Sequence, residues 1–477
     1  MPSSSTGQIV AVGVASLFVI ALGALLSLYF GRRAKNSADW LAAPGQLPLI
    51  VVVITQFAAG VGGGVLIAHV GIAYAYGWSV FAYEACVVLG FFSLALIARW
   101  LREQRFTTVP DIISRLFGAH KAVTVVAGIA ALIVPFGALC TQFVAFAKLF
   151  GLLTGIPAAV LILAIMLGSL VFVLPGGLTS VAWTDFVFGI FKIIMSFVVA
   201  GYAIHLAGGW AGITTTVPSQ LWLPSAITSA GGERIWLWVA AIVPGTMTNQ
   251  LYFQRVFATK NVGDARRGLV LAGLTILVAG VYAGCIGLAV RAMNPGLGNP
   301  EAAAGWLITR LPTALLAVYG AFLVATIISA TGAALQSVVA NLTRDLYQNA
   351  FGRSRNDRQT VSLSRLFTVI VAVIAGALAI AFPSALGWLV GTYAYSAATL
   401  AAPIFLGYLL RKRFPLRPHA ALGSIIAGIA GCATAQIIGT TVPYVVYGLA
   451  ASVLALLAFG VGQRAPTTTP ELSSSER

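Results

Sequence analysis

The sequence predicts an all-α polytopic membrane protein with about thirteen transmembrane helices. Of its 477 residues, 59% are hydrophobic and only 8% are charged, whereas roughly 25% are charged in ordinary soluble domains. The mean hydropathy is +0.95. The apolar runs are long and unbroken, which favours helices over the alternating strands of a membrane barrel. The composition therefore argues against a soluble enzyme.

The apolar runs are long enough to place each helix in order along the chain. Windows of about 19 residues on a hydropathy scale predict the following spans: 8–30, 46–72, 78–100, 121–150, 157–175, 183–206, 235–256, 268–291, 312–344, 362–382, 386–410, 419–439 and 442–462.

Basic residues follow every second predicted span. Arg32, Arg33 and Lys35 follow the first, and Arg255 and Lys260 follow the seventh. Short loops rich in Lys and Arg stay in the cytoplasm, so the pattern predicts an N-terminus outside and a C-terminus inside the cell. Because these charges mark topology, the net charge of +16 does not indicate nucleic acid. The expected location is the cell membrane, as a multi-pass protein of a bacterial inner membrane.

Two predicted spans contain helix-breaking residues. The second has Gly60, Gly62, Gly63 and Gly64 at bilayer depth. Such a break must be buried in protein or line a cavity, because lipid cannot satisfy free backbone groups. Close helix packing through small residues is the alternative.

The seventh span has Val243-Pro244-Gly245-Thr246 in its middle, where proline removes a backbone donor. A simple kink is the alternative. Each interrupted helix opens a set of five predicted spans, the second to sixth and the seventh to eleventh. Because five is odd, the second set would cross the membrane in the opposite direction. Inverted repeats that begin with broken helices are typical of secondary transporters.

This pattern predicts one transmembrane domain over residues 1–462, without an output domain that would favour a membrane sensor. Its expected parts are a first repeat (45–207), an inverted second repeat (233–410), peripheral helices (8–30, 419–439 and 442–462) and a disordered cytoplasmic tail (463–477).

Few ionisable residues fall inside the predicted spans. Glu84 and Asp185 are the two of twelve acidic residues that clearly do, and such groups are functional candidates. Lys192 follows Asp185 by seven residues, so a structural ion pair between them is the alternative. For His69 and His205, a satisfied polar residue at a helix end is favoured over a proton relay. No catalytic motif is present, which predicts that the chain is not an enzyme.

Several segments together resemble the sodium:solute symporter family, whose members share the inverted five-helix repeat of the leucine-transporter fold. Thr107–Asp111 resembles its TxPD loop, and Gly176–Asp185 its GGLxAVxxTD segment. Asn249–Lys260 is similar to its NQxxxQRxxAxK segment, and Ile328–Tyr347 to its MST…DLY helix. They occur in family order.

The resemblance implies a sodium site between the broken helix and the 312–344 helix. Its ligands would be the carbonyl oxygens of Ala58, Val61 and Thr326, the hydroxyl of Ser329, and Asp185. The sequence departs from the family pattern, because Ala330 replaces a second hydroxyl and Gly60 an acidic residue. Thr331 or Asp185 would complete the shell, and the alternative is a proton carried by Asp185 or Glu84.

The resemblance also suggests where a solute binds. Glu84 stands where sugar-transporting relatives have a glutamate that contacts the sugar. Val65 replaces their polar residue, and the neighbouring glycines would leave room and free N–H donors. The predicted solute-binding residues are Gly62, Gly63, Gly64, Val65, Glu84, Gly245 and Thr246.

The sequence thus predicts a cation-coupled symporter that works by alternating access. Sodium is the first candidate ion, and a proton-coupled symporter or an uncoupled uniporter of the same fold is the alternative. The expected partners are a small polar solute (an organic acid, an amino acid or a sugar) and the lipid bilayer, with no nucleic acid and no obligate protein partner.

Overall fold

The computed structural model describes residues 6–32, 47–104, 106–174, 177–350, 352 and 356–460, with the side chains of 177–180, 350 and 460 outside this description. The predicted tail (463–477) and two residues of the first basic loop, Arg33 and Lys35, lie outside the described residues.

The described chain is built from helices with short connections. In chain order the α-helices are α1 Thr6–Gly31, α3 Leu49–Gly60, α4 Gly63–Tyr76, α5 Val80–Glu103, α6 Val109–Phe117, α7 Lys121–Thr154, α8 Ala158–Val173, α9 Gly177–Leu206, α10 Gly209–Thr216, α11 Ser219–Trp222, α12 Gly232–Thr248, α13 Gln250–Phe257, α14 Val262–Met293, α15 Ala303–Ile308, α16 Thr313–Ala340, α17 Asp357–Ala381, α18 Ala385–Ser396, α19 Gly407–Leu410, α20 Pro418–Ile438 and α21 Tyr444–Gly460. Three 3₁₀ segments, η1 Gly77–Ser79, η2 Pro224–Thr228 and η3 Pro300–Ala302, and two π-helical segments, η4 Asn341–Ala350 and η5 Ala397–Leu406, join them.

Nine helical stretches among the described residues are long and apolar enough to cross a membrane. One of them is continuous from α4 through η1 into α5 (Gly63–Glu103), and three shorter apolar helices stand beside the nine. The apolar runs therefore fold as helices, as predicted. The count of thirteen spans and their orientation stay predictions.

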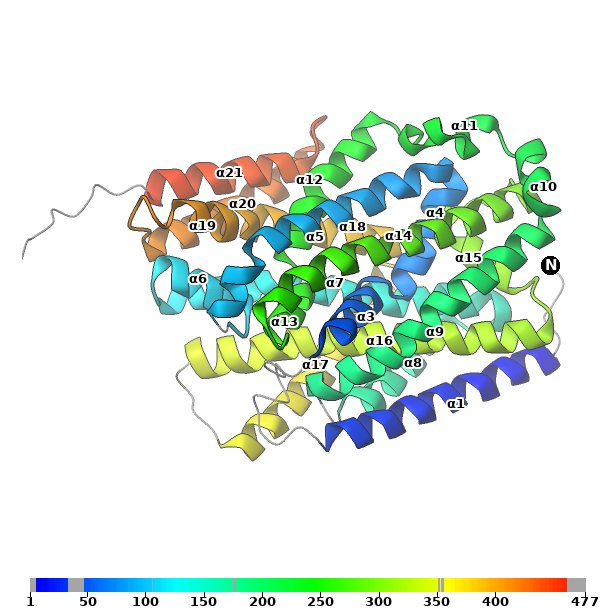
Figure 1. Cartoon of the computed structure of the whole chain (residues 1–477), viewed down its shortest axis with the longest axis horizontal. Coiled ribbons are helices and arrows are strands. Elements are labelled where there is room, and N and C mark those ends of the chain that lie inside the picture. The colour runs from blue at the N-terminus through cyan, green and yellow to red at the C-terminus, as the bar shows by residue number, and fades with distance from the viewer. Residues whose placement is uncertain are drawn as a thin grey trace, which may run out of the picture.

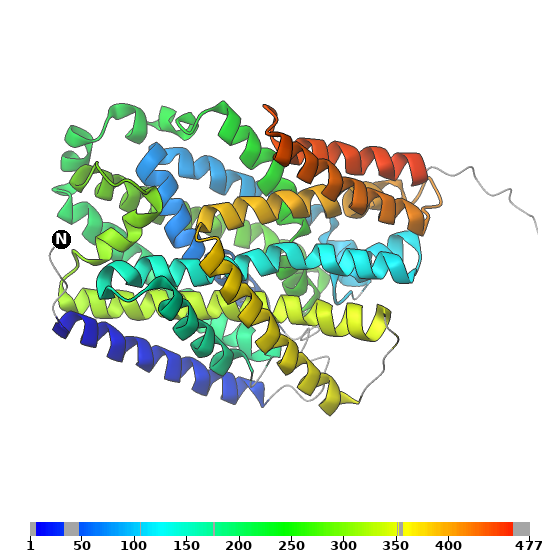
Figure 2. The same ribbon diagram turned by 180° about the vertical axis from the view of Figure 1, so that it is seen from behind.

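The helices run roughly along the long axis of the molecule (Figure 1). Helix α16 lies in the interior, where it packs against α1, α7 and α9, and 72% of its most apolar window is buried. For α1, only 17% of the most apolar window is buried. The α20–α21 pair packs against η5 on the flank opposite α1 (Figure 2). The bundle thus has a buried centre with flanking helices on either side.

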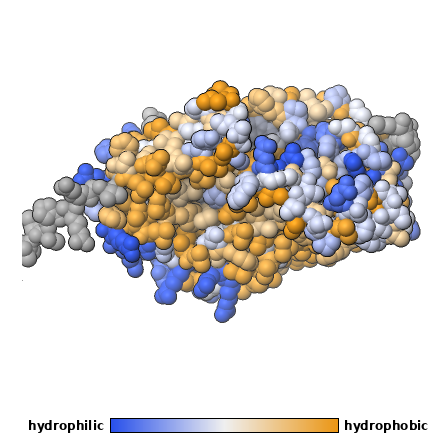
Figure 3. Space-filling view, turned by 90° about the horizontal axis from the view of Figure 1, so that it is seen from above, coloured by the Kyte–Doolittle hydropathy of each residue, from blue (hydrophilic) through white to orange (hydrophobic). Residues whose placement is uncertain are grey.

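The ends of the chain lie at opposite ends of this bundle. Helix α1 begins at the end that carries α10 and α15, and α21 ends near α6 and α19 (Figure 1). Seen from above, one face has a broad hydrophobic area, with strongly hydrophilic groups along its lower left edge and over its right-hand part (Figure 3). Such a surface suits a lipid environment along the helices and water at their ends.

The short helix α6 shows how local sequence sets a helix start. The Asp111 carboxylate accepts hydrogen bonds from the backbone N–H groups of Thr107 (2.9 Å) and Thr108 (3.3 Å). Pro110 lies in the first turn, where a missing N–H costs nothing. The TxPD segment is therefore a helix cap at the α6 end of the bundle.

Candidate functional site

The predicted break in the second span is present. Helix α3 ends at Gly60 and α4 begins at Gly63, while Val61 has φ −100° and ψ 77° and Gly62 is extended. The N–H group of Gly63 donates to the side-chain oxygen of Gln142 on α7 (2.7 Å). One freed backbone donor of the break is therefore satisfied by a neighbouring helix.

The glycines at this break do not leave the room that the sequence suggested. A Cβ atom on Gly63 would lie 2.3 Å from a side-chain carbon of Ile327, and one on Gly64 would lie 1.8 Å from the Thr141 methyl group. A Cβ on Gly62 would lie 2.6 Å from Gln142. Close packing against α7 and α16 fills this space, so the break and the small-residue packing coexist. A role for these glycines in solute binding stays a prediction.

A lysine side chain binds the carbonyl oxygens at the break. The Nζ atom of Lys192 on α9 donates to the carbonyl oxygens of Ala58 (2.8 Å) and Val61 (3.3 Å), and its side chain is 1% exposed. Gly189, one turn earlier, lets α9 approach α3 closely, because a Cβ there would lie 2.6 Å from Ile54. We name this group of Ala58 O, Val61 O and Lys192 the break cradle. An ammonium group thus occupies carbonyls that the family resemblance assigns to sodium.

The alternative ion pair between Lys192 and Asp185 does not form. Asp185 instead accepts from Arg255 Nη2 on Oδ2 (2.9 Å) and from Ser329 Oγ on Oδ1 (2.5 Å), and all of these side chains are buried. The hydroxyls of Thr326 and Thr331 have no hydrogen-bond partner among the described residues. Ser329 and Asp185 therefore bind each other, while Ala58 and Val61 bind Lys192.

Arg255 was expected among the basic loop residues, and that expectation is wrong. Its side chain is 1% exposed, and its second terminal nitrogen donates to the carbonyl oxygen of Leu251 (2.9 Å). Helix α13 packs against α3, α5 and α16, so a residue that is polar by sequence enters the interior and neutralises Asp185. Lys260, just beyond, is exposed as expected.

The predicted break at Val243–Thr246 is also wrong. Helix α12 continues through Pro244 to Thr248, and the chain leaves the helix only at Asn249 (ψ 115°) before α13 begins. The Asn249 side chain caps α13 by accepting from the Leu251 N–H group (3.0 Å). A proline can therefore remain inside the helix, and the break falls where a capping side chain is available.

Gly245 and Thr246 consequently lie within a helix and not in an unwound segment. A Cβ atom added to Gly245 would lie 2.7 Å from Tyr393. A Cβ atom added to Gly90 of α5 would lie 2.5 Å from the Cβ of Thr246, so Thr246 packs closely against α5. The Thr246 hydroxyl has no hydrogen-bond partner among the described residues. Contact of either residue with a solute stays a prediction.

A buried polar cluster lies between α4, α5 and α12. His69 Nδ1 and Glu84 Oε1 are 2.6 Å apart, and both side chains are at most 2% exposed. The His69 ring packs on Tyr83, which in turn packs on Trp238, with centroid distances of 4.6 and 5.6 Å. His69 Nε2 has no partner among the described residues. We name His69, Tyr83, Glu84 and Trp238 the central polar cluster.

His69 therefore differs from the expectation of a satisfied histidine at a helix end. It lies in the interior of α4 and pairs with a buried carboxylate, whereas His205 does lie in the last turn of α9 and is exposed. Spacing along the chain could not reveal the pair, since His69 and Glu84 lie on separate helices. Val65, one turn before His69, is half-buried against the core.

Tyrosines connect the second break to the first. The Asn249 amide donates to the Tyr393 hydroxyl (3.3 Å), which lies 3.4 Å from the Tyr252 hydroxyl. The Tyr252 hydroxyl lies against Gly60, 3.2 Å from a Cβ built on that glycine. The amide of Gln56 in α3 donates to the Tyr252 carbonyl (3.2 Å). The two helix breaks thus meet in the buried middle of the bundle.

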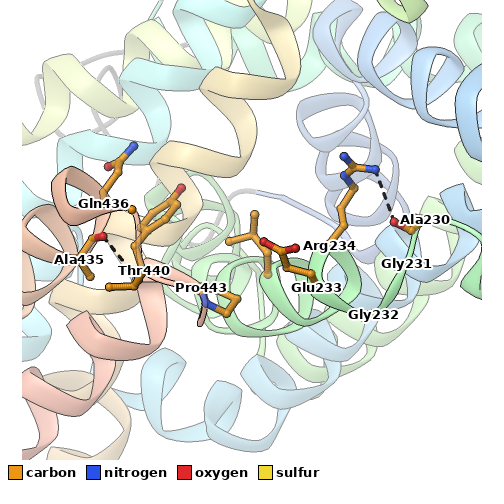
Figure 4. Close-up of a pocket in the computed structure, with 12 residues that line it drawn as sticks. Ala230, Gly231, Gly232, Glu233, Arg234, Ala435, Gln436, Thr440 and Pro443 are labelled. Carbon is orange, nitrogen blue, oxygen red and sulfur yellow. Dashed lines mark hydrogen bonds between the residues drawn. The ribbon is translucent and has the colours of Figure 1, made fainter.

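Two of the hollows among the described residues have Arg234 in their lining. One, of about 480 Å³, lies between the start of α12 and the turn from α20 to α21. Glu233 and Arg234 face it from α12, with Gln436 and Thr440 opposite (Figure 4). The other, of about 390 Å³, follows α4 and is also lined by Arg234. Neither hollow is lined by a residue of the central polar cluster.

Polar contacts tie the helices together at both ends. At the α15 end Glu301 binds Lys148 and accepts from the Leu386 N–H group (2.8 Å). At the α6 end the Thr108 hydroxyl donates to Asp345 (2.8 Å), and Arg344 lies 3.3 Å from Asp111. These contacts join segments that are distant in sequence at each end of the bundle.

Comparison with known proteins agrees with this architecture. The sequence model of the sodium:solute symporter family matches residues 40–431. A sodium/glucose cotransporter of Vibrio parahaemolyticus is 25% identical, over 75% of this chain and 72% of the relative. A sodium/sialic acid symporter of Proteus mirabilis is 21% identical, over 75% of each chain. A mouse sodium/myo-inositol cotransporter is 22% identical, and the match spans 59% of its length.

The solved structures give the fold. The structure of a Na⁺-coupled sialic acid symporter in a substrate-bound outward-open state matches with a TM-score of 0.80 and 18% identity, over 94% of this chain and 97% of the other. The nucleobase-cation symporter Mhp1 matches with a TM-score of 0.57 and 16% identity, over 89% and 97%. The family match over most of the sequence and this shared architecture identify the chain as a membrane protein of the sodium:solute symporter family with the leucine-transporter fold.

Proposed function

We propose that this chain is a secondary transporter that moves a small polar organic solute across the cell membrane by alternating access. The observation that carries this proposal is the meeting of two interrupted helices in the buried centre of the bundle. Interrupted helices at mid-membrane depth are where secondary transporters bind their solutes. The contact sets at the two ends would then open in turn.

The central polar cluster is the proposed centre of the solute site. A buried carboxylate beside an imidazole with a free nitrogen offers both an acceptor and a further polar atom. Tyr83 and Trp238 add flat aromatic surfaces next to them. Such surfaces suit the apolar face of a sugar ring, while charged groups bind its hydroxyls.

The relatives support a sugar, a polyol or a sugar acid as the first solutes to test, since they are named for glucose, myo-inositol and sialic acid. Small organic acids and amino acids follow as the other candidates. We place the protein in a bacterial inner membrane with its N-terminus outside and C-terminus inside.

Sodium is the first candidate for the coupling ion, because the family and its named relatives are sodium symporters. The observation that favours the second candidate, transport without sodium in the break cradle, is the binding of Lys192 to Ala58 and Val61. A proton symporter and an uncoupled uniporter both fall under this second candidate.

The test is solute exchange in proteoliposomes made with the purified protein. Counterflow of a labelled solute against the same unlabelled solute reports transport whether or not an ion gradient drives it. A panel of sugars, polyols, sugar acids, organic acids and amino acids would be screened, with imposed sodium and proton gradients as separate arms. Absence of exchange for every solute, with folded protein, would contradict the proposal.

A substitution in the central polar cluster then tests the site. Glu84→Gln keeps a side chain that can bind His69 but removes the charge, so exchange should fall by about tenfold or more while the fold persists. Cys285→Ala, on α14 outside the cluster, should leave exchange unchanged. Equal exchange by the Glu84→Gln protein would move the solute site elsewhere.

A further inference from the structure

The break cradle already contains a cation. Its two carbonyl oxygens belong to the end of α3 and to the break itself, and both accept hydrogen bonds from the Lys192 ammonium group (2.8 and 3.3 Å). We infer that Lys192 is the resident cation of this cradle, so that no sodium ion binds there. For its consequence in transport the inference rests on the proposed function, since solute movement would then not require sodium at this position.

The remaining oxygens do not form an alternative sodium shell. Sodium, like other hard cations, needs several oxygen ligands at once. The Ser329 hydroxyl donates to Asp185, whose other oxygen binds Arg255. Ala330 offers no side-chain oxygen. The hydroxyls of Thr326, which was expected to contribute its carbonyl oxygen, and of Thr331 lack a hydrogen-bond partner within the described residues. The expected ligand set is therefore divided between an ammonium group and an ion pair.

The buried charges point the same way. Lys192 and Arg255 bring two positive charges and Asp185 brings one negative charge, and each of these side chains is at most 1% exposed. The group already has one positive charge in excess. A sodium ion on the same carbonyls would add a second at short range, where the interior screens charge poorly. Repulsion would keep sodium out unless Lys192 moved away.

Lys192 also makes the connection that a bound ion would otherwise make. Its side chain reaches from α9 to residues on both sides of the end of α3, namely Ala58 within the helix and Val61 in the break. The close approach at Gly189 keeps α9 near enough for this contact. The ammonium group thus satisfies carbonyl oxygens that the broken helix leaves without their usual partners.

The test measures thermal stability in detergent, in choline buffer with and without added sodium, and needs no solute. In the unchanged protein, sodium should not raise the melting temperature by binding at the break cradle. Lys192→Ala should melt at a lower temperature in choline, because it leaves two buried carbonyls unpaired. Sodium can then enter the emptied space and should raise its melting temperature by roughly 2 °C or more.

Two variants serve as matched controls. Lys192→Met exposes the same carbonyls but fills the space, so it should be destabilised without any recovery in sodium. Ser196→Ala, one turn further along α9, loses only a bond to its own helix and should behave as the unchanged protein does. Potassium at equal concentration should not reproduce the recovery of Lys192→Ala.

Two results would overturn the inference. The first is sodium stabilisation of the unchanged protein that Ser329→Ala removes, since sodium would then bind at the site that the family resemblance assigns to Ser329 and the cradle carbonyls, despite Lys192. The second is equal stabilisation of Lys192→Ala and Lys192→Met. If Lys192→Ala does not fold, the comparison of the unchanged protein with Ser329→Ala still tests the inference. Absence of a sodium-dependent rise in melting temperature that depends on Ser329 supports it. Failure to find a transported solute would contradict the proposed function without altering these readings.

Discussion

The two helix breaks satisfy their backbone groups in different ways. At the break between α3 and α4, the free carbonyl oxygens bind the side chain of Lys192, more than a hundred residues away in sequence. At the break between α12 and α13, Asn249 caps the next helix itself, and the Thr248 hydroxyl bonds to the carbonyls of Pro244 and Gly245 (3.1 Å each). The first break depends on a distant charge, and the second largely on its own residues.

This difference predicts how each break responds to change. The first break should be sensitive to any loss of charge balance on α9 or α13, because the charged groups there are buried and coupled. The second break should lose only the modest contribution of a helix cap. The first is therefore the better candidate for an ion-dependent or charge-dependent step, and the second for a fixed structural bend.

The largest effect is expected for Asp185→Asn. It would leave Arg255 as a buried cation without its carboxylate, close to the buried Lys192, and breaking a buried pair in this way costs about 3–5 kcal/mol of stability. Thermal unfolding and size-exclusion profiles in detergent measure the loss. Glu103→Gln, which removes an exposed carboxylate from a surface pair, should change little. Similar stability of both variants would show that the first break does not rely on charge.

Gly64→Ala should have the next largest effect. The added methyl group would meet the Thr141 side chain at 1.8 Å, and overpacking of this kind costs about 1–3 kcal/mol. Removing the opposing methyl by Thr141→Ser should recover part of the loss, which a double-mutant cycle of melting temperatures would detect. Gly13→Ala, where nothing lies within 4 Å, is the control and should be neutral. No coupling between residues 64 and 141 would contradict this contact.

Asn249→Ala should cost about 1 kcal/mol, because it removes the cap of α13. Asn249→Asp keeps an oxygen to accept from the Leu251 N–H group but loses the donor to Tyr393. Comparing the two separates capping from the contact with Tyr393. Unfolding measurements in which Asn249→Ala costs as much as Asp185→Asn would remove the distinction between the breaks.

The smallest effect is expected for Thr248→Val. Its hydroxyl lies 2.8 Å from that of Ser396, but it also bonds to carbonyls of its own helix, so the net loss should be about 0.5–1 kcal/mol. Thermal melts of Thr248→Val, Ser396→Ala and the double variant would give the coupling between the two hydroxyls. A coupling larger than the Asn249→Ala effect would mean that the end of α18 fixes the second break.

Much of the architecture follows from hydropathy alone. Long apolar runs must form helices in lipid because every backbone group needs an internal partner, and the predicted spans correspond closely to the helices observed. The glycine-rich break was also predictable, since four glycines within five positions rarely sustain a buried helix. The prediction of a break at Pro244 was wrong because the surroundings of a proline within a helix can accommodate it. The observed break lies instead at the capping residue Asn249.

The sequence by itself determined the helical membrane class and the interruption at Gly60–Gly63, because these depend on composition and on local backbone chemistry. The family followed from the resemblance of several motifs and from the match of the family model. Only the tertiary structure decided which groups meet there. Lys192 and Asp185 lie on one helix, yet one binds the carbonyls of α3 and the other binds Arg255 of α13. Such pairing is set by how α9, α13 and α16 pack around the break, and the spacing of residues in the sequence does not predict that packing.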